Sequence, residues 1–312
     1  GVRRDELLAA LRRGGVAWLV LAVLLGAGGA GLRGLPWTRP AGDPITVALV
    51  QGAIPQEEKW QPGTYGWIVG RHLELTEPYW GTDLIVWPEA AITRFQHQAG
   101  PVLESLDARG RRAGSAVIAG IPAWEREADG EGSFRNSAVA VGEGSGRYDK
   151  RRLVPFGEYV PLEGWLRGLI DLFDLPMSRS RPGPWEQAPL TVRGQLVALA
   201  ICYEIVYGEL VRVSARDAGL IVTISNDAWF GDSIGPYQHQ QMARMRAIEL
   251  RKPVLRATND GITALFDPRG RSPGRLPRFE PGVLTGTITP RTGATPYARW
   301  GDGPAAALAG VL

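Results

Sequence analysis

The chain has 312 residues, and 44% of them are hydrophobic, which is enough to bury a substantial core and argues against disorder over most of its length. The formal net charge of +3 comes from arginines scattered along the chain without a basic block, so nucleic acid is not a predicted partner. One cysteine and three widely spaced histidines exclude an internal disulfide and a cysteine-rich zinc site, and they indicate neither a metal nor any other cofactor.

Residues 16–32 form a stretch of 17 residues without a charge, close to the roughly 20 that a helix needs to cross a bilayer. We therefore predict a transmembrane helix here, with a signal peptide and a buried core helix as the alternatives. By the positive-inside rule, the excess of arginines before this stretch puts the start of the chain in the cytoplasm. Both a transmembrane helix and a signal peptide would carry the following residues across the membrane. These arginines are Arg3, Arg4, Arg12 and Arg13, against Arg33 and Arg39 just after the stretch.

Short apolar runs rich in β-branched residues then recur between turn residues, and each has the length of a strand. They begin near residues 45, 83, 116, 137, 195, 220, 253, 262 and 283. Stretches with helical periodicity lie between several of them, at residues 64–79, 101–113, 206–218 and 236–252. This alternation predicts an α/β domain, and the number of strands suggests two mixed sheets packed on one another with helices outside.

Two segments stand apart from this pattern. Residues 161–187 carry many large apolar side chains and then break into prolines and arginines. They fit either a core helix followed by a loop or an apolar lid that touches lipid, with Arg179 and Arg181 near phosphate headgroups. Residues 296–312 end in a second apolar stretch, so we interpret the chain as a piece of a longer membrane protein. Residues 1–42 would be the cytoplasmic start, the membrane helix and a linker, and residues 43–295 would be one domain.

The single cysteine, Cys202, ends the apolar run QLVALAICYE and is either inert core or a nucleophile. A thiol attacks a carbonyl carbon well only as a thiolate, so it needs a base or a cation beside it and a group that binds the oxyanion. None of the histidines sits at the end of a predicted strand, and His239 lies on a predicted helix among polar residues, where a surface or supporting role fits better than catalysis. The predicted base is therefore a carboxylate.

Glu89 directly follows the apolar strand DLIVWP, where a partly desolvated carboxylate is a good base near neutral pH. Lys150 follows another strand, and its ammonium group can stabilise first the thiolate and then the oxyanion. The backbone N–H of Tyr203 is a natural second donor, because it directly follows the nucleophile. Taken singly, these residues also fit core packing, a loop charge and a solvated surface lysine, and it is their combination that indicates chemistry.

These motifs resemble the Glu-Lys-Cys triad of the nitrilase superfamily, and within it they are most similar to the apolipoprotein N-acyltransferase family. The resemblance covers nearly the whole chain. Its motifs are VALVQGAIPQEEKW, WPEAAI, YDKRRLVPFGEYVPL, ICYE and ISNDAWFGDSIGPYQHQQMARMRAIE. It implies an αββα sandwich preceded by a transmembrane helix. The triad alone indicates only the superfamily, whereas PFGEYVP, NDAWFG and the apolar flanks indicate the acyltransferases.

The resemblance also implies roles for further residues. Glu89, Lys150 and Cys202 would be catalytic, with Glu158 as a second active-site carboxylate that supports Lys150. Tyr203 and Glu204 would form the oxyanion site and shape the pocket. The aromatic side chains that would contact the acyl chain or a lid are Trp60, Trp229 and Phe230. Ordinary roles as loop charges or core aromatics remain the alternatives for each of these residues.

The implied activity is transfer of a fatty acyl chain from a membrane phospholipid, through a thioester on Cys202, to the N-terminal amine of diacylglyceryl-cysteine in apolipoproteins. The expected location is the bacterial inner membrane, with the catalytic domain facing the periplasm. A nitrilase-type amidase, in which water resolves the acyl-enzyme, shares the triad but gives no reason for residues 16–32. A membrane-anchored binding domain without catalysis is the other alternative, and an intact triad argues against it.

Overall fold

The computed structural model describes residues 4–126, 132–159 and 180–311. The chain forms two compact units, residues 1–37 and residues 38–312. The first unit contains helix α1, Arg4–Gly34, and the second contains both large sheets.

Helix α1 is the predicted apolar helix. Its segment Gly15–Leu32 is long and apolar enough to cross a membrane by length and composition, and none of that segment is buried within the protein. The large side chains along it, from Val16 to Leu32, are exposed. Exposed leucine and valine on all sides of a helix are typical of a helix that lies in lipid rather than of a helix on a protein core.

Within the described residues, the second unit contains two mixed six-stranded sheets. The first has the strand order β13, β2, β3, β4, β5, β7, and β2, β3 and β4 are parallel to one another. Its strands are β2 Ile45–Gln51, β3 Leu84–Val86, β4 Ala116–Arg126, β5 Gly132–Gly142, β7 Arg147–Asp149 and β13 Gly282–Ile288. The prediction that the sheets are not wholly parallel is confirmed, because β4, β5 and β7 form an antiparallel meander.

The second sheet has the order β12, β11, β10, β9, β8, β6, with β9, β10 and β11 parallel. Its strands are β6 Gly144–Ser145, β8 Leu190–Val192, β9 Gln195–Ile201, β10 Leu220–Ser225, β11 Val254–Thr258 and β12 Ala264–Phe266. A separate antiparallel pair joins β1, Thr38–Pro40, to β14, Arg291–Gly293. The short strands β6, β7 and β8 were not predicted as separate elements, because two or three residues carry no periodic signal.

The four predicted helical stretches are present as α3, α4, α6 and α7, whereas α2, α8 and α9 were not predicted. The α-helices are α2 Gln56–Lys59, α3 Tyr65–Thr76, α4 Gly100–Ala113, α6 Gly208–Ser214, α7 Gly235–Leu250, α8 Pro296–Trp300 and α9 Gly303–Val311. Short 3-10 helices are η1 Glu77–Tyr79, η2 Gln96–Gln98, η3 Cys202–Val206 and η4 Asp227–Phe230. The predicted helix over 206–218 begins only at Gly208, because the chain first forms η3.

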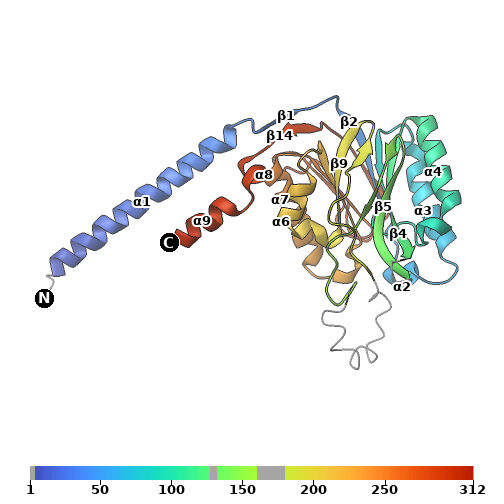
Figure 1. Cartoon of the computed structure of the whole chain (residues 1–312), viewed down its shortest axis with the longest axis horizontal. Coiled ribbons are helices and arrows are strands. Elements are labelled where there is room, and N and C mark those ends of the chain that lie inside the picture. The colour runs from blue at the N-terminus through green and yellow to red at the C-terminus, as the bar shows by residue number, and fades with distance from the viewer. Residues whose placement is uncertain (1–3, 127–131, 160–179, 312) are drawn as a thin grey trace, which may run out of the picture. The chain divides into compact units, whose positions relative to one another are not determined.

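The two sheets pack face to face, and helices cover both outer faces, α3 and α4 on one and α6 and α7 on the other (Figure 1). Leu49 of β2 and Leu199 of β9 belong to the same central cluster between the sheets. On the outer faces, Leu106 of α4 packs over the first sheet and Ala243 of α7 over the second. Strands buried on both faces read as continuous apolar runs, which is why the sequence showed them clearly. The predicted αββα sandwich is confirmed.

The lid or core helix predicted over 161–187 lies largely outside the described residues, which omit 160–179. The described part, residues 180–187, is an irregular segment, in which Ser180 forms an isolated bridge with Phe134 of β5. This contact places Ser180 beside β5, the strand that also carries Asn136.

Candidate active site

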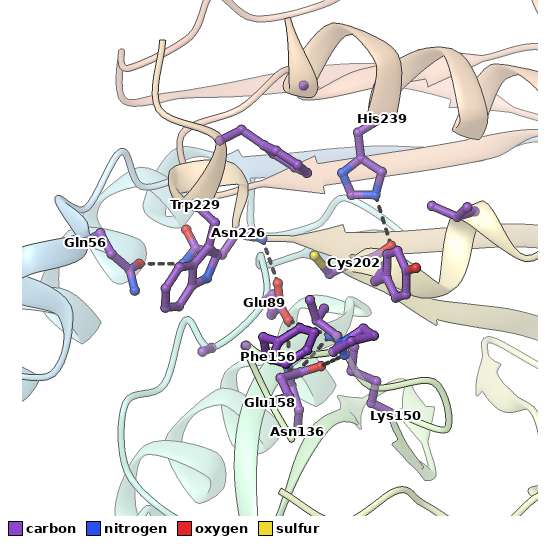
Figure 2. A pocket seen from close by; sticks show the side chains of 18 of the residues that line it. Gln56, Glu89, Asn136, Lys150, Phe156, Glu158, Cys202, Asn226, Trp229 and His239 are labelled. Carbon is purple, nitrogen blue, oxygen red and sulfur yellow. Dashed lines mark hydrogen bonds and ion pairs between the residues drawn. The ribbon is translucent and has the colours of Figure 1, made fainter. Parts of the chain in front are cut away.

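The parallel strands of both sheets end at the same edge of the sandwich, and polar side chains follow each of them. Glu89 comes after β3, Cys202 after β9 and Asn226 after β10. In α/β folds, the carboxyl ends of parallel strands are where ligands bind. A cavity of about 580 Å³ lies here, and Glu89, Lys150 and Cys202 all line it (Figure 2).

Cys202 is the first residue of η3 and directly follows β9, where the backbone is strained. Its φ is 52°, in the left-handed region that a residue with a side chain rarely adopts. Strain of this kind persists only where the surrounding structure enforces it, and it recurs at functional sites. The side chain is partly buried against the central core cluster. The turn thus takes the thiol out of the strand and presents it at the cavity.

Burial raises the pKa of the Cys202 thiol, the Glu89 carboxylate raises it further, and the Lys150 ammonium opposes them, which leaves the pKa at about 12. The resting side chain is therefore a neutral thiol at physiological pH. A thiol in this state becomes a nucleophile only when a base removes its proton as the reaction begins.

Glu89 is buried, and hydrogen bonds fix both of its carboxylate oxygens. Oε1 accepts from the Asn136 Nδ2 at 2.6 Å, and Oε2 accepts from the backbone N–H of Asn226 at 2.7 Å. The Nζ of buried Lys59 donates to the Glu89 carbonyl oxygen at 2.9 Å. Two donors from different parts of the chain thus orient the carboxylate, and Lys59 holds the backbone of the same residue.

Gly120 explains how the loop of Glu89 can lie so close to β4. A Cβ atom at this position would meet the Pro88 carbonyl oxygen and would lie 2.8 Å from the Glu89 Cα. Real Cβ atoms do not approach backbone this closely, so only glycine allows the loop to pack here. Ala90, the next residue of the loop, has a φ of 48°, which bends the chain directly after Glu89.

Lys150 follows β7 and is fully buried. Its Nζ lies 2.9 Å from Glu158 Oε1 and 3.5 Å from Glu89 Oε1. Burial alone would lower the pKa of Lys150, but the two carboxylates more than offset it, and the pKa lies well above its ordinary value. The side chain is therefore a permanent cation, which suits a group that stabilises negative charge.

Glu158 lies where the sequence resemblance implies, against Lys150. Its Oε1 also accepts from Asn136 Nδ2 at 3.1 Å, and its Oε2 accepts from the backbone N–H of Val154 at 2.8 Å. Asn136 therefore bridges Glu89 and Glu158 (Figure 2). The structure thus joins both carboxylates and the lysine in one network.

Glu204 lies behind the site and is not among the side chains that line the cavity. Its buried carboxylate accepts from the backbone N–H groups of Ile201 and Arg151, at 2.8 and 2.7 Å, and from the Tyr148 hydroxyl. Burial raises the pKa of Glu204, and these donors oppose the rise. The side chain ties the end of β9 to the segment after Lys150, and so it fixes the spacing between nucleophile and cation.

Aromatic side chains surround the mouth of the cavity. The predicted contacts Trp60, Trp229 and Phe230 all line it, and so does Tyr203. Trp229 is 67% exposed although it lies at the cavity, and Phe156 at 62% is similar. Large aromatic groups exposed around an apolar cavity are a surface for an apolar ligand.

Several residues of the site were not singled out from the sequence. Asn136 lies within β5, away from any strand end, and nothing in its local sequence marks it. Asn226 and Asp227 follow a strand in the motif ISND, which is a usable signal. His239, for which the sequence left a surface or supporting role, is buried, and its Nε2 lies 3.0 Å from the Cys202 carbonyl oxygen.

Among the described residues no cluster of His, Cys, Asp and Glu is arranged to hold a metal ion.

Residues 46–297 match the family described as carbon-nitrogen hydrolase. The chain is 46% identical over 296 residues to the apolipoprotein N-acyltransferase of Pseudomonas aeruginosa, an alignment that covers 94% of this chain and 58% of that protein. It is 48% identical over 295 residues to the enzyme of the same name from Azotobacter vinelandii, covering 94% and 57%. The chain thus spans less than two thirds of the length of these relatives.

Solved structures show the same fold. A CN-hydrolase superfamily protein from Xanthomonas campestris matches with a TM-score of 0.58 at 20% identity, over 80% of this chain and 91% of that one. A nitrilase-superfamily protein from Saccharomyces cerevisiae matches with a TM-score of 0.58 at 17% identity, over 80% and 91%. With the family match over most of its length and this shared fold, the chain belongs to the carbon-nitrogen hydrolase family.

Proposed function

We propose that this chain carries the activity for which its relatives are named, N-acylation of apolipoproteins, with a membrane phospholipid as the acyl donor. The observation that carries the proposal is a thiol, a carboxylate and a buried ammonium group around one cavity whose mouth is aromatic and exposed. The relatives' name supports a lipoprotein acceptor. The donor is proposed from the apolar character of the cavity mouth.

In the proposed first step, Glu89 takes the proton of the Cys202 thiol as sulfur attacks the ester carbonyl of the phospholipid. The oxyanion is stabilised by the Lys150 ammonium group and by the Tyr203 N–H. The C–O bond to the lysophospholipid then breaks, and Glu89 returns the proton to the departing oxygen. The product is a thioester on Cys202.

In the second step, the free amine of a diacylglyceryl-modified N-terminal cysteine attacks the thioester. Glu89 takes a proton from the amine, the C–S bond breaks, and the proton passes to the departing sulfur. The lipoprotein gains an amide, and the thiol is regenerated. Thioesters react readily with amines, so a cysteine nucleophile suits transfer to nitrogen.

Helix α1 supports a membrane location, with the second unit on the periplasmic side as the positive-inside rule predicts from the flanking arginines. A nitrilase-type amidase would use the same three groups, with water in place of the amine. The exposed aromatic mouth favours the acyltransferase, because a small amide has no need of it.

The proposal is tested by mass spectrometry of the intact chain after exposure to phospholipid vesicles. We expect an acyl adduct on the wild type that hydroxylamine removes, and no such adduct on Cys202→Ser. An adduct of the same kind on the Ser variant would place the nucleophile elsewhere. Rapid hydrolysis of small amides without any acyl adduct from phospholipid would favour the amidase.

A further inference from the structure

Three buried side chains connect in series behind the nucleophile. Arg256 donates from its Nη2 to Asp227 Oδ2 at 2.6 Å, and Asp227 Oδ1 lies 3.0 Å from His239 Nδ1. His239 Nε2 then lies 3.0 Å from the carbonyl oxygen of Cys202 (Figure 2). Arg256 and Asp227 are fully buried, and His239 is 4% exposed. The proposed transfer steps use none of the three.

The hydrogen-bond geometry fixes which nitrogen of His239 carries a proton. A carbonyl oxygen can only accept, so Nε2 must donate to Cys202. On the other side, Nδ1 either accepts from Arg256 Nη2, at 3.2 Å, or donates to Asp227. Nε2 therefore keeps its proton whichever of the two states the ring adopts, and the ring is held in this orientation from its far side.

The carbonyl that His239 binds belongs to the same peptide group as the Tyr203 N–H. A trans peptide is planar, so its C=O and N–H point in opposite directions. Fixing the Cys202 carbonyl toward α7 therefore aims the Tyr203 N–H away from α7. In Figure 2, His239 and Lys150 lie on opposite sides of Cys202, so this N–H points to the side of the site on which Lys150 lies.

The contact with His239 lies at the turn where the chain leaves β9 and enters η3. With a φ of 52° Cys202 has left the extended conformation of β9, and His239 Nε2 donates to its carbonyl oxygen. Tyr203 is the second residue of η3, and the first amides of a helix have no acceptor within it. Rotation of this peptide group changes ψ of Cys202 and φ of Tyr203, and the hydrogen bond from His239 restrains that rotation.

We propose that His239, oriented by Asp227 and Arg256, is a positioning residue that holds the Cys202–Tyr203 peptide group so that the Tyr203 N–H faces the oxyanion. The inference rests on the proposed role of Tyr203 as oxyanion donor. A hydrogen bond to the carbonyl also polarises the peptide group and strengthens its N–H as a donor. His239 thus acts on the transition state through the backbone, without contact with the substrate.

The test compares two reactions of the same thiol in the full chain. Acylation by a p-nitrophenyl ester forms an oxyanion and releases p-nitrophenolate, whereas alkylation by iodoacetamide displaces iodide and forms none. In His239→Ala we expect the acylation rate constant to fall about 100-fold, the loss typical of one misplaced oxyanion donor, while alkylation changes less than about twofold. The pH profile of alkylation is expected to stay that of the wild type.

Two further variants separate positioning from a structural effect. His239→Gln keeps an N–H donor near the position of Nε2. We expect its acylation rate constant to be at least about tenfold higher than that of His239→Ala. His72→Gln removes a second buried histidine, which does not line the cavity, and we expect acylation near the wild-type rate. Acylation and alkylation that fall together in His239→Ala would overturn the proposal, as would a shifted pH profile of alkylation.

Because the p-nitrophenyl ester is not a phospholipid, this test can fail or succeed independently of the proposed acyl donor. If the p-nitrophenyl ester acylates the wild-type chain and phospholipid vesicles do not, only the proposed phospholipid donor is contradicted. A wild-type chain acylated by neither would overturn the oxyanion role of Tyr203 and this inference with it. Unchanged acylation in His239→Ala would overturn the positioning role alone.

Discussion

Lys150 Nζ lies closer to Glu158 than to Glu89, at 2.9 Å against 3.5 Å. The ammonium group therefore makes its shorter ion pair with the carboxylate that we do not propose as the base. Glu158 also accepts from Val154 N–H, which fixes it on the loop after Lys150. We propose that Glu89 exchanges the proton of Cys202 and that Glu158 holds the lysine in position.

Glu158→Gln tests this division of labour. The variant keeps a hydrogen bond to Lys150 but loses the charge, so we expect acyl transfer to fall about tenfold while alkylation of Cys202 by iodoacetamide persists. Glu209→Gln is the matched control, because Glu209 pairs with Arg212 on the surface. Its acyl transfer should match the wild type, and an equal loss in both variants would contradict the assignment.

Glu89→Gln should separate thiol reactivity from acyl transfer. The Glu89 carboxylate raises the pKa of Cys202, so its neutralisation lowers that pKa and leaves more thiolate at pH 8. We expect faster alkylation of Cys202 than in the wild type, together with a loss of acyl transfer of about 1,000-fold, because the base is gone. If alkylation slowed instead, Glu89 would already hold the proton in the resting enzyme.

The pH dependence of the wild type follows from the same pKa of about 12. Below this value the thiol is neutral and above it the thiolate forms, so reactivity increases with pH. We expect the alkylation rate constant to rise about tenfold per pH unit across the alkaline range in which the fold persists. The rate constant is measured by quenching the alkylation reaction at set times and quantifying the adduct by mass spectrometry. A plateau of the rate constant below about pH 9 would mean that the resting site holds a thiolate.

Lys150→Met should be costly for stability as well as for activity. It leaves Glu89 and Glu158 buried without their cation, and removal of one partner of a buried ion pair typically costs about 3–5 kcal/mol. We expect the free energy of unfolding in urea to fall by an amount of this order. Adding Glu158→Gln to Lys150→Met should restore part of it, and a double variant less stable than Lys150→Met alone would contradict the explanation.

Gly120→Ala tests whether close backbone packing positions Glu89. The new Cβ would lie 2.8 Å from the Glu89 Cα, so the loop must move, and we expect a loss of about 1–3 kcal/mol in the free energy of unfolding. Acyl transfer should fall as well. Gly70→Ala in α3, where a Cβ would meet nothing within 4 Å, is the control, and its stability should be unchanged or slightly higher.

The sequence was sufficient for the two sheets and their helices, because strands buried on both faces and amphipathic helices leave strong patterns. It also singled out Glu89 and Cys202, which follow or end apolar strands, whereas Lys150 follows the short polar strand β7 and was recognised from its motif. Asn136 could not be predicted, because its role comes from the antiparallel pairing of β4, β5 and β7, which brings it to Glu89 and Glu158.

The contact between His239 and Cys202 was out of reach for a similar reason. Two residues 37 positions apart meet only when α7 packs over the end of β9. The polar neighbours of His239 suggested a surface or supporting role, and its burial and its contact with the Cys202 backbone favour the latter. Long-range contacts between a helix and a turn have no periodic signal along the chain, so they become visible only in the fold.

The most direct test of the central claim, a thioester on Cys202 that is resolved by an amine, is a single-turnover transfer. The acyl-enzyme is formed with phospholipid vesicles and separated from them. It is then incubated with or without a diacylglyceryl-cysteine peptide, and the masses of enzyme and peptide are measured by mass spectrometry. We predict that the acyl mass leaves Cys202 rapidly only when the peptide is present and appears on the peptide amine. Loss of the acyl group to water at the same rate with or without the peptide would contradict the account.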